Sequence, residues 1–314
     1  MVSAVAFSPD GKTLASGAFD GLIFFWDPVT GVPFKTIRAQ SSGVAALAYS
    51  PHGRLLASAG RDSTIKIWDA TSGNELRTLK GHVRDVHSLA FSPDGTLLAA
   101  GDDYGEVILW AGEDWSIKRR FSPVTSERYV DFHTVSFSAD GTYLAAFSHR
   151  LVMLWEVGTG RIVRSVRLPP SPSYGQLVIA GAISSDGHTL VTTTSDRGLH
   201  LYNTATGKEN SVVVSPGDPA NYWWGGVSLT RDGTLVAVAI NKAISVWAMA
   251  RKTGQPPSLR WQGTSTDLIT HVAVSPDGKW LACASIDHTV KIWNVETGRL
   301  ARTLGSPYVP QDEN

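Results

Sequence analysis

Seven copies of one pattern run through the chain, and their period constrains the fold more than any other feature. Each copy contains a glycine turn related to Ser-Pro-Asp-Gly, at Gly11, Gly53, Gly95, Gly141, Gly187, Gly233 and Gly278. An aromatic residue follows each glycine by 14 or 15 positions: Trp26, Trp68, Trp110, Trp155, Tyr202, Trp247 and Trp293. Successive glycines are 42 to 46 residues apart. A repeat of roughly 40–45 residues with four strand-like runs is typical of β-propeller blades.

We therefore predict an all-β fold, a seven-bladed β-propeller of four-stranded antiparallel blades. The chain of 314 residues could hold two average domains, but the repeat overrides this length argument. Residues 1–305 are expected to form one propeller and residues 306–314 a polar C-terminal tail. The predicted blades span approximately 1–40, 41–82, 83–124, 125–170, 171–216, 217–262 and 263–305.

The second repeat shows the four predicted strands most clearly. An apolar run at 44–49 suits the innermost strand, and the Ser-Pro-His-Gly turn at 50–53 reverses the chain. Apolar residues at 55–59 form the second strand, and 64–68 alternates polar and apolar residues as a half-exposed strand does. Residues 75–79 form the outer strand. Since blades pack on their neighbours, we assign the seven repeat aromatics to blade packing and not to function.

Composition excludes several classes of protein. The 28 basic and 28 acidic residues cancel, so the chain lacks the positive charge that nucleic-acid backbones attract. The single cysteine, Cys283, rules out an intramolecular disulfide framework and favours a reducing compartment. No run of 18 apolar residues predicts a membrane span, and residues 1–7 already belong to the first repeat, so no signal peptide is expected.

The motifs in these repeats resemble those of WD-repeat (WD40) β-propellers over residues 1 to about 305. They are Gly-His at 81–82, Trp-Asp at 26–27 and 68–69, and Thr-Gly at 30–31, 159–160, 206–207 and 297–298. The near-uniform Ser-Pro-Asp-Gly turns are similar to those of bacterial WD-repeat proteins, in which the propeller is often joined to a kinase, nucleotidase or protease domain.

The resemblance also implies a hydrogen-bonded set within a blade, made by a histidine, a serine or threonine, an aspartate and the tryptophan. No repeat carries all four residues. The first two repeats lack the histidine and keep Ser16, Asp20 and Trp26, and Ser58, Asp62 and Trp68. In the third repeat Ala100 replaces the hydroxyl and Asp103 stands one position early, while Cys283 replaces the serine in the seventh. We therefore expect mainly apolar packing to hold the blades.

Ring closure departs from the pattern of most WD-repeat propellers, in which an N-terminal strand completes the last blade. Here the chain opens on an innermost strand and reaches its own outer strand at 299–304. We expect either closure by packing of the first blade against the seventh, or a missing upstream strand.

The face of the ring that carries the connections between second and third strands and between blades varies most, and we call it the loop face. Long inserts are predicted there at 122–131, 169–176, 216–225 and 255–267. The candidate partner-binding residues on it are Phe19, Arg61, Tyr104, Arg128, Tyr129, Arg150, Tyr174, Arg197, Tyr222, Trp223 and Lys242. Aromatic and arginine side chains are typical of interaction hot spots. Alternatively, Tyr174 and Trp223 cover the blade ends, and Trp224 shares the register of inner-strand core positions.

Chemistry is not expected at the histidines or acids. His87 and His133 share an inner-strand register and His271 lies one position off, but a zinc site needs three or four converging ligands. Asp102 and Asp103 are interpreted as a solvated turn pair. The sequence has no nucleophile elbow, Walker loop or dinucleotide fingerprint. We therefore predict no catalytic residue, no metal and no cofactor.

These observations predict a non-enzymatic scaffold or sensor module, located in the cytoplasm, that presents its loop face to a protein or peptide partner. Two alternatives stay open. One is a propeller enzyme, a hydrolase or lyase with a site in the central channel, although small inner-strand residues such as Ala4, Ala46 and Ser88 argue against it. The other is a propeller fragment of a larger bacterial signalling protein.

Overall fold

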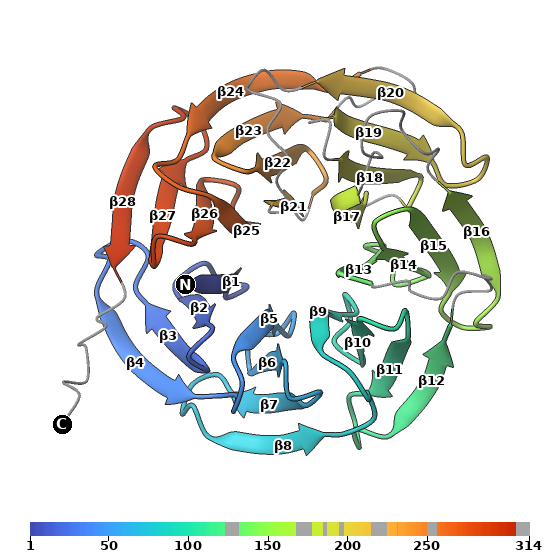
Figure 1. Ribbon diagram of the computed structural model, residues 1–314, viewed down its shortest axis with the longest axis horizontal. Helices are drawn as coiled ribbons and strands as arrows, with labels where there is room; N and C mark the ends of the chain where they lie inside the picture. The colour runs from blue at the N-terminus through green and yellow to red at the C-terminus, as the bar shows by residue number, and fades with distance from the viewer. Residues whose placement is uncertain are drawn as a thin grey trace.

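The chain folds into a ring of seven four-stranded antiparallel sheets (Figure 1). The computed structural model describes residues 1–122, 132–167, 178–184, 187–194, 198–214, 225–230, 232–249 and 256–305. The described residues contain strands and turns and no helix. The prediction of an all-β, seven-bladed propeller is confirmed.

The first four blades each use four consecutive strands, ordered from the centre outward (Figure 1). Blade 1 contains β1 (Val2–Phe7), β2 (Leu14–Ala18), β3 (Leu22–Trp26) and β4 (Pro33–Arg38). Blade 2 contains β5 (Val44–Tyr49), β6 (Leu55–Gly60), β7 (Ile65–Asp69) and β8 (Glu75–Leu79). Blade 3 contains β9 (Val86–Phe91), β10 (Leu97–Asp102), β11 (Val107–Ala111) and β12 (Ile117–Phe121). Blade 4 contains β13 (Thr134–Phe137), β14 (Tyr143–Phe147), β15 (Leu151–Glu156) and β16 (Ile162–Arg167).

The remaining three blades repeat this order. Blade 5 contains β17 (Val178–Ile183), β18 (Thr189–Thr194), β19 (Gly198–Asn203) and β20 (Glu209–Val214). Blade 6 contains β21 (Gly225–Leu229), β22 (Leu235–Ile240), β23 (Ala243–Ala248) and β24 (Ser258–Thr264). Blade 7 contains β25 (Ile269–Val274), β26 (Trp280–Ser285), β27 (Thr289–Asn294) and β28 (Leu300–Gly305).

The turn between first and second strands is built by short polar contacts. In blade 1 the Ser8 hydroxyl donates to the Asp10 carboxylate (2.6 Å), which also accepts from the amide of Lys12 (3.0 Å). Gly11 takes the positive φ of 70° that a side chain would strain. These hydrogen bonds, the one from Ser8 first, hold the pKa of Asp10 below its usual range. The same serine or threonine to aspartate contact recurs at Ser92–Asp94, Ser138–Asp140, Thr230–Asp232 and Ser275–Asp277.

The apolar core lies between neighbouring blades rather than inside any one of them. One cluster joins Leu97, Ala99 and Leu109 of blade 3 to residues of blade 4 such as Leu144 and Trp155. The Trp155 ring lies 5.1 Å from the ring of Phe121 between centroids. The seven repeat aromatics are all buried: Trp26, Trp68, Trp110, Trp155, Tyr202, Trp247 and Trp293.

Side chains of four outer strands also tie their blades to the following blade. Arg119 of β12 donates to the carbonyl of Thr159 in blade 4 (2.7 Å), and the Trp261 indole of β24 donates to the carbonyl of Val295 in blade 7 (2.6 Å). Lys35 reaches the carbonyl of Thr71 in blade 2 in the same way, and Arg164 reaches that of Ala205 in blade 5. Each acceptor lies in the turn between third and fourth strands. The outer strands therefore contribute to blade association although they are largely exposed.

The ring closes by packing of blade 1 against blade 7, the first of the two expected alternatives. Val2 and Val5 share a buried cluster with Ala282, Ile292 and Leu304. The Thr270 hydroxyl donates to the carbonyl of Val2 (2.8 Å). Both blades keep four strands that are contiguous in sequence (Figure 1).

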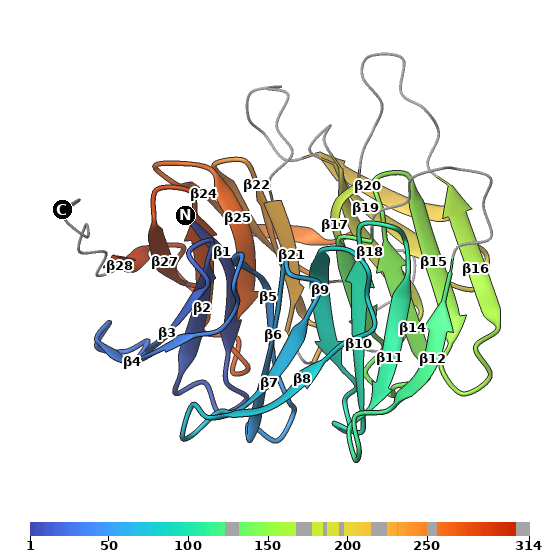
Figure 2. The same cartoon turned by 60° about the horizontal axis from the view of Figure 1, so that its bottom comes forward.

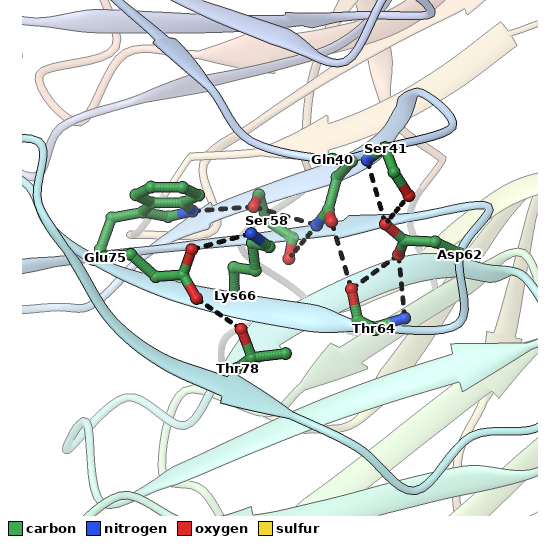
Figure 3. A network of polar contacts seen from close by, with 9 residues as sticks. Gln40, Ser41, Ser58, Asp62, Thr64, Lys66, Glu75 and Thr78 are labelled. Carbon is green, nitrogen blue, oxygen red and sulfur yellow. Dashed lines mark hydrogen bonds and ion pairs between the residues drawn. The ribbon is translucent and has the colours of Figure 1, made fainter.

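The hydrogen-bonded set of blade 2 is more complete than the sequence indicated (Figure 3). The Trp68 indole donates to the Ser58 hydroxyl (2.9 Å), to which the Gln40 amide also donates (3.2 Å). The Thr64 hydroxyl donates to the Asp62 carboxylate (2.6 Å) and lies 3.3 Å from the amide oxygen of Gln40. Gln40 thus stands where blade 3 has His82, 42 residues (one repeat) earlier. Blade 2 thus adds a hydrogen-bonded set to the apolar packing that it shares with blades 1 and 3.

The predicted insert at 255–267 is also wrong. Residues Ser258–Thr264 form β24, which pairs with β23 from Ala248 to Ala243. Residues 256 and 257 lie between β23 and β24, on the side of the Thr-Gly turns and away from the loop face. The strand follows two prolines, and its polar and apolar residues do not alternate regularly. Its conformation therefore depends on pairing with β23 and not on the local sequence. The other predicted inserts lie almost wholly outside the described residues.

Ala100→Ser tests whether blade 3 lacks only the hydroxyl that blade 2 possesses. Ala100 pairs with Ile108 as Ser58 pairs with Lys66, and His82 Nε2 is buried without a hydrogen-bond partner among the described residues. The new hydroxyl should bond His82, and also Trp110 as Ser58 bonds Trp68, so the free energy of unfolding should rise by about 1 kcal/mol. Chemical denaturation measures the change.

The neighbouring Ala99→Ser is the matched control for this substitution. Ala99 is equally buried, but its side chain points to the opposite face of β10. A hydroxyl there finds none of these partners and should lower the free energy of unfolding by about 1–3 kcal/mol. Equal destabilisation by both variants would contradict the proposed register of the set.

Candidate functional site

The described candidate residues all lie in turns between second and third strands. Phe19 follows β2, Arg61 follows β6, Tyr104 lies between β10 and β11, Arg150 precedes β15 and Lys242 precedes β23. These turns lie at one end of their blades, opposite the Ser-Pro-Asp-Gly turns. The other candidates lie outside the described residues: Arg128, Tyr129, Tyr174, Arg197, Tyr222 and Trp223. Trp224 lies outside them as well.

Blades 1 to 3 present two arginine–aromatic stacks on the loop face. The Arg61 guanidinium of blade 2 lies 4.5 Å from the ring centroid of Phe19 of blade 1. Arg84, in the connection that leads into blade 3, lies 4.5 Å from the ring of Tyr104 and donates to its hydroxyl (2.8 Å). Beside Arg84, Val83 is 82% exposed. We call Phe19, Arg61, Val83, Arg84 and Tyr104 the arginine rim.

Sequence reasoning missed Arg84 and Val83. Both follow the Gly81-His82 motif directly, so they stand in a connection between blades. The candidate residues named from the sequence belong to long inserts and to turns between second and third strands. The position of these two residues immediately after a motif that fixes the chain is the signal that would have found them.

One buried carboxylate holds both chain segments of the blade 3 part of the rim. Asp102, at the end of β10, is 1% exposed and accepts from His82 Nδ1 (2.8 Å). It also accepts from the backbone amides of Tyr104 and Glu106 (2.9 Å each). Burial alone would raise the pKa of Asp102, but these hydrogen bonds outweigh it and keep the pKa below its usual range. Asp102 therefore fixes the segment before Arg84 and the turn that carries Tyr104.

The interpretation of Asp102 and Asp103 as a solvated turn pair is wrong. Asp102, the last residue of β10, is the aspartate that contacts the histidine of this blade, rather than Asp103. Asp103 instead contacts His87 on β9, with 2.6 Å between His87 Nε2 and the carboxylate oxygen. Desolvation alone would lower the pKa of His87, but the hydrogen bond and charge of Asp103, with the charge of Asp85, raise it above its usual value.

The inner-strand histidines have different neighbours. His87 pairs with Asp103, the His133 ring lies 4.9 Å from that of His149, and burial lowers the pKa of His271 to about 4. Two sets of three residues each bring possible metal-ligand atoms within 4.8 Å of one another. One set is His82, Asp102 and Glu106, and the other is Asp85, His87 and Asp103. In both groups the histidine already bonds an aspartate, and Glu106 also pairs with Arg120 (2.8 Å). A metal would have to displace these contacts.

Two candidates lie away from the arginine rim. Lys242 donates to the carbonyl of Thr266 (3.0 Å) and lies 3.4 Å from the Asp267 carboxylate, so it joins a blade 6 turn to the connection that enters blade 7. Arg150 is exposed on blade 4. The structure thus brings together Phe19 with Arg61 and Tyr104 with Arg84, and places Arg150 and Lys242 on other blades.

Comparison with known proteins identifies the repeats. The family model described as "WD domain, G-beta repeat" matches residues 1–27, 31–69, 73–111 and 256–294. An uncharacterized WD repeat-containing protein of Synechocystis is 27% identical over 147 residues, 46% of this chain and 40% of that protein. WD repeat-containing protein SL1-17 of Schistosoma mansoni is 26% identical over 48% of this chain and 45% of its own length. A ribosome biogenesis protein BOP1 homolog of Drosophila virilis is 49% identical over 15% of this chain and 6% of its own.

The chain thus matches less than half the length of each of these relatives. The described strands and turns include no helix of the length and apolarity that would cross a membrane.

Titration of His87 tests the contact between its imidazole and the Asp103 carboxylate. Asp103 should hold the pKa of His87 above 6.5, and Asp103→Asn should lower it, because the hydrogen bond then lacks a charged acceptor. NMR titration of the imidazole measures both values. An unchanged pKa in Asp103→Asn would contradict the contact. Since folding raises this pKa, the stabilisation is complete below pH 6.5 and is lost as the pH rises through the folded-state value.

Proposed function

We propose that this chain, which belongs to the WD-repeat family, is a non-enzymatic scaffold or sensor module that binds a protein or peptide partner on its loop face. The observation that carries this proposal is the arginine rim, in which two guanidinium groups on neighbouring blades are stacked on aromatic rings 4.5 Å away. Arginine and tyrosine are enriched among the residues that dominate binding energy at protein interfaces.

The rim is ordered before a partner arrives. Stacking on Phe19 and Tyr104 restricts the long side chains of Arg61 and Arg84. Asp102 holds the backbone of the turn with Tyr104 and, through His82, the segment that leads to Arg84. A side chain that is already ordered loses less conformational entropy on binding. The stacked guanidinium groups keep N–H donors available for carbonyl or carboxylate groups of a peptide.

The proposed surface extends beyond the rim. It includes Arg150 and Lys242 on blades 4 and 6, and it includes the candidates outside the described residues: Arg128, Tyr129, Tyr174, Arg197, Tyr222 and Trp223. We also propose that the chain acts in the cytoplasm of a bacterium. Its single cysteine and its likeness to a Synechocystis protein support this location.

Affinity capture with matched variants tests this function. Arg61→Ala with Tyr104→Ala removes one cation and one aromatic ring from the loop face. Lys12→Ala with Phe34→Ala removes the same kinds of side chain elsewhere, and both of those residues are exposed. A protein that the intact chain and the second variant retain, and the first loses, would support the proposal. With that partner purified, the first variant should bind about tenfold more weakly or worse.

Thermal unfolding of both variants supplies the control. Similar melting temperatures would show that lost capture reflects lost contacts. Equal capture of every partner by the two variants would refute a binding role for the rim.

A further inference from the structure

Two carboxylates and one imidazole converge at the loop-face end of the inner strands of blade 3. Asp85 directly precedes β9, His87 lies on β9, and Asp103 directly follows β10. β9 and β10 are the innermost strands of this sheet (Figures 1 and 2). One possible ligand atom of each of these residues lies within 4.8 Å of those of the other two. The cluster is therefore compact enough for all three side chains to contact one ion.

The Asp85 carboxylate is the member of this cluster that the fold does not use. Its side chain forms no hydrogen bond or ion pair within the described part of the chain. The backbone carbonyl of Asp85 accepts from the amide of Asp103 (3.3 Å), so the two segments that carry the carboxylates are already joined. Asp103 also contacts His87 (2.6 Å). Two carboxylates thus face one imidazole, and negative charge is in excess even when that imidazole is protonated.

The separations between these side chains suit a small divalent cation. Bonds from Zn²⁺ to imidazole nitrogen or carboxylate oxygen are about 2.0–2.2 Å, so two atoms on one ion lie roughly 3–4 Å apart. His87 Nε2 and the Asp103 oxygen need to separate slightly from 2.6 Å, and the Asp85 oxygen needs a small rotation toward them. The ion then replaces the proton shared by His87 and Asp103, and that proton passes to solvent.

Solvent reaches the cluster, and three protein ligands leave room for a further one. The side chains of His87 and Asp103 are 31% and 39% exposed, whereas those of His82 and Asp102 are 1% and 2% exposed. A tetrahedral ion with three protein ligands keeps one position for water or another ligand. An imidazole among the ligands favours Zn²⁺ over Mg²⁺ and Ca²⁺, which are bound mainly by oxygen.

Two nearby cations are held by aromatic rings and not by these carboxylates. The Arg61 guanidinium is stacked on Phe19, and that of Arg84 is stacked on Tyr104 and donates to its hydroxyl. The charge of Arg61 also acts on His87 and opposes a second positive charge beside it. Arg61 therefore limits the affinity for an ion but does not occupy the ligands.

We propose that Asp85, His87 and Asp103 bind Zn²⁺ or a similar divalent transition metal ion at the loop-face end of the inner strands. The carboxylates supply the negative charge, and the imidazole supplies the preference for a transition metal. The ion would join the segment that carries Arg84 to the turn that carries Tyr104. From the sequence no metal was expected, because Asp85 stands in a connection whose path the repeat does not define. The site does not require the partner binding proposed above.

Calorimetric titration with Zn²⁺ alone tests the site. The intact chain should bind one ion more tightly than any other. His87→Gln with Asp85→Asn should weaken this binding about tenfold or more, since loss of even an outer partner of a metal ligand costs about 10–100-fold. His52→Gln with Glu113→Gln removes the same kinds of group at exposed positions elsewhere and should leave binding unchanged. Equal binding by both variants would show an adventitious ion only and would overturn the proposal.

Two further measurements do not depend on the stability of that variant. In the intact chain the imidazole NMR signals of His87 should shift at the lowest Zn²⁺ concentrations, before those of His52. The rings of His133 and His149 lie 4.9 Å apart and could compete for the ion, but His149→Gln should leave binding unchanged. Lost binding in His149→Gln, or unshifted His87 signals, would overturn the site. Equally tight binding of Mg²⁺ would overturn the assignment of a transition metal.

Discussion

The contact between neighbouring sheets is the interaction on which the whole ring depends. Among the described residues the apolar clusters span neighbouring blades, as when Leu109 and Trp155 from adjacent blades are buried together. The outer strands strengthen the same junctions when Arg119 and Trp261 donate to carbonyls of the following blade. Every polar feature of the two faces and the perimeter is displayed on this apolar frame, whose stability is a sum of nearest-neighbour terms.

Within that frame blades 2 and 3 satisfy their polar groups differently. Blade 2 connects Gln40, Ser58 and Trp68 in one set, and blade 3 pairs His82 with Asp102. The second solution has a consequence for the surface, since Asp102 also holds the turn with Tyr104 and the connection with Arg84. The hydrogen bonds of Asp102 therefore stabilise blade 3 internally and also fix the segments that carry Arg84 and Tyr104 of the arginine rim.

The sequence was sufficient for the repeat architecture because glycine turns and buried aromatics recur at a nearly fixed spacing. It was not sufficient for contacts that depend on register. Asp102 contacts His82 and Asp103 contacts His87, and no local pattern shows which of the two neighbouring aspartates takes which histidine. Gln40 was overlooked because the resemblance named histidine, whereas a side-chain amide can make the same hydrogen bond. The stack of Arg84 on Tyr104 could not be predicted because it joins two segments through tertiary packing.

Closure without strand exchange affects how such a ring can change over evolutionary time. Each blade is one uninterrupted stretch of chain, including blades 1 and 7 at the seam. A gene segment that encodes one repeat can therefore be duplicated, lost or exchanged without taking a strand from another blade. The seam itself uses the same kinds of contact as other junctions, a buried apolar cluster and a hydroxyl to carbonyl bond. Any boundary between blades could serve as the start of a rearranged gene.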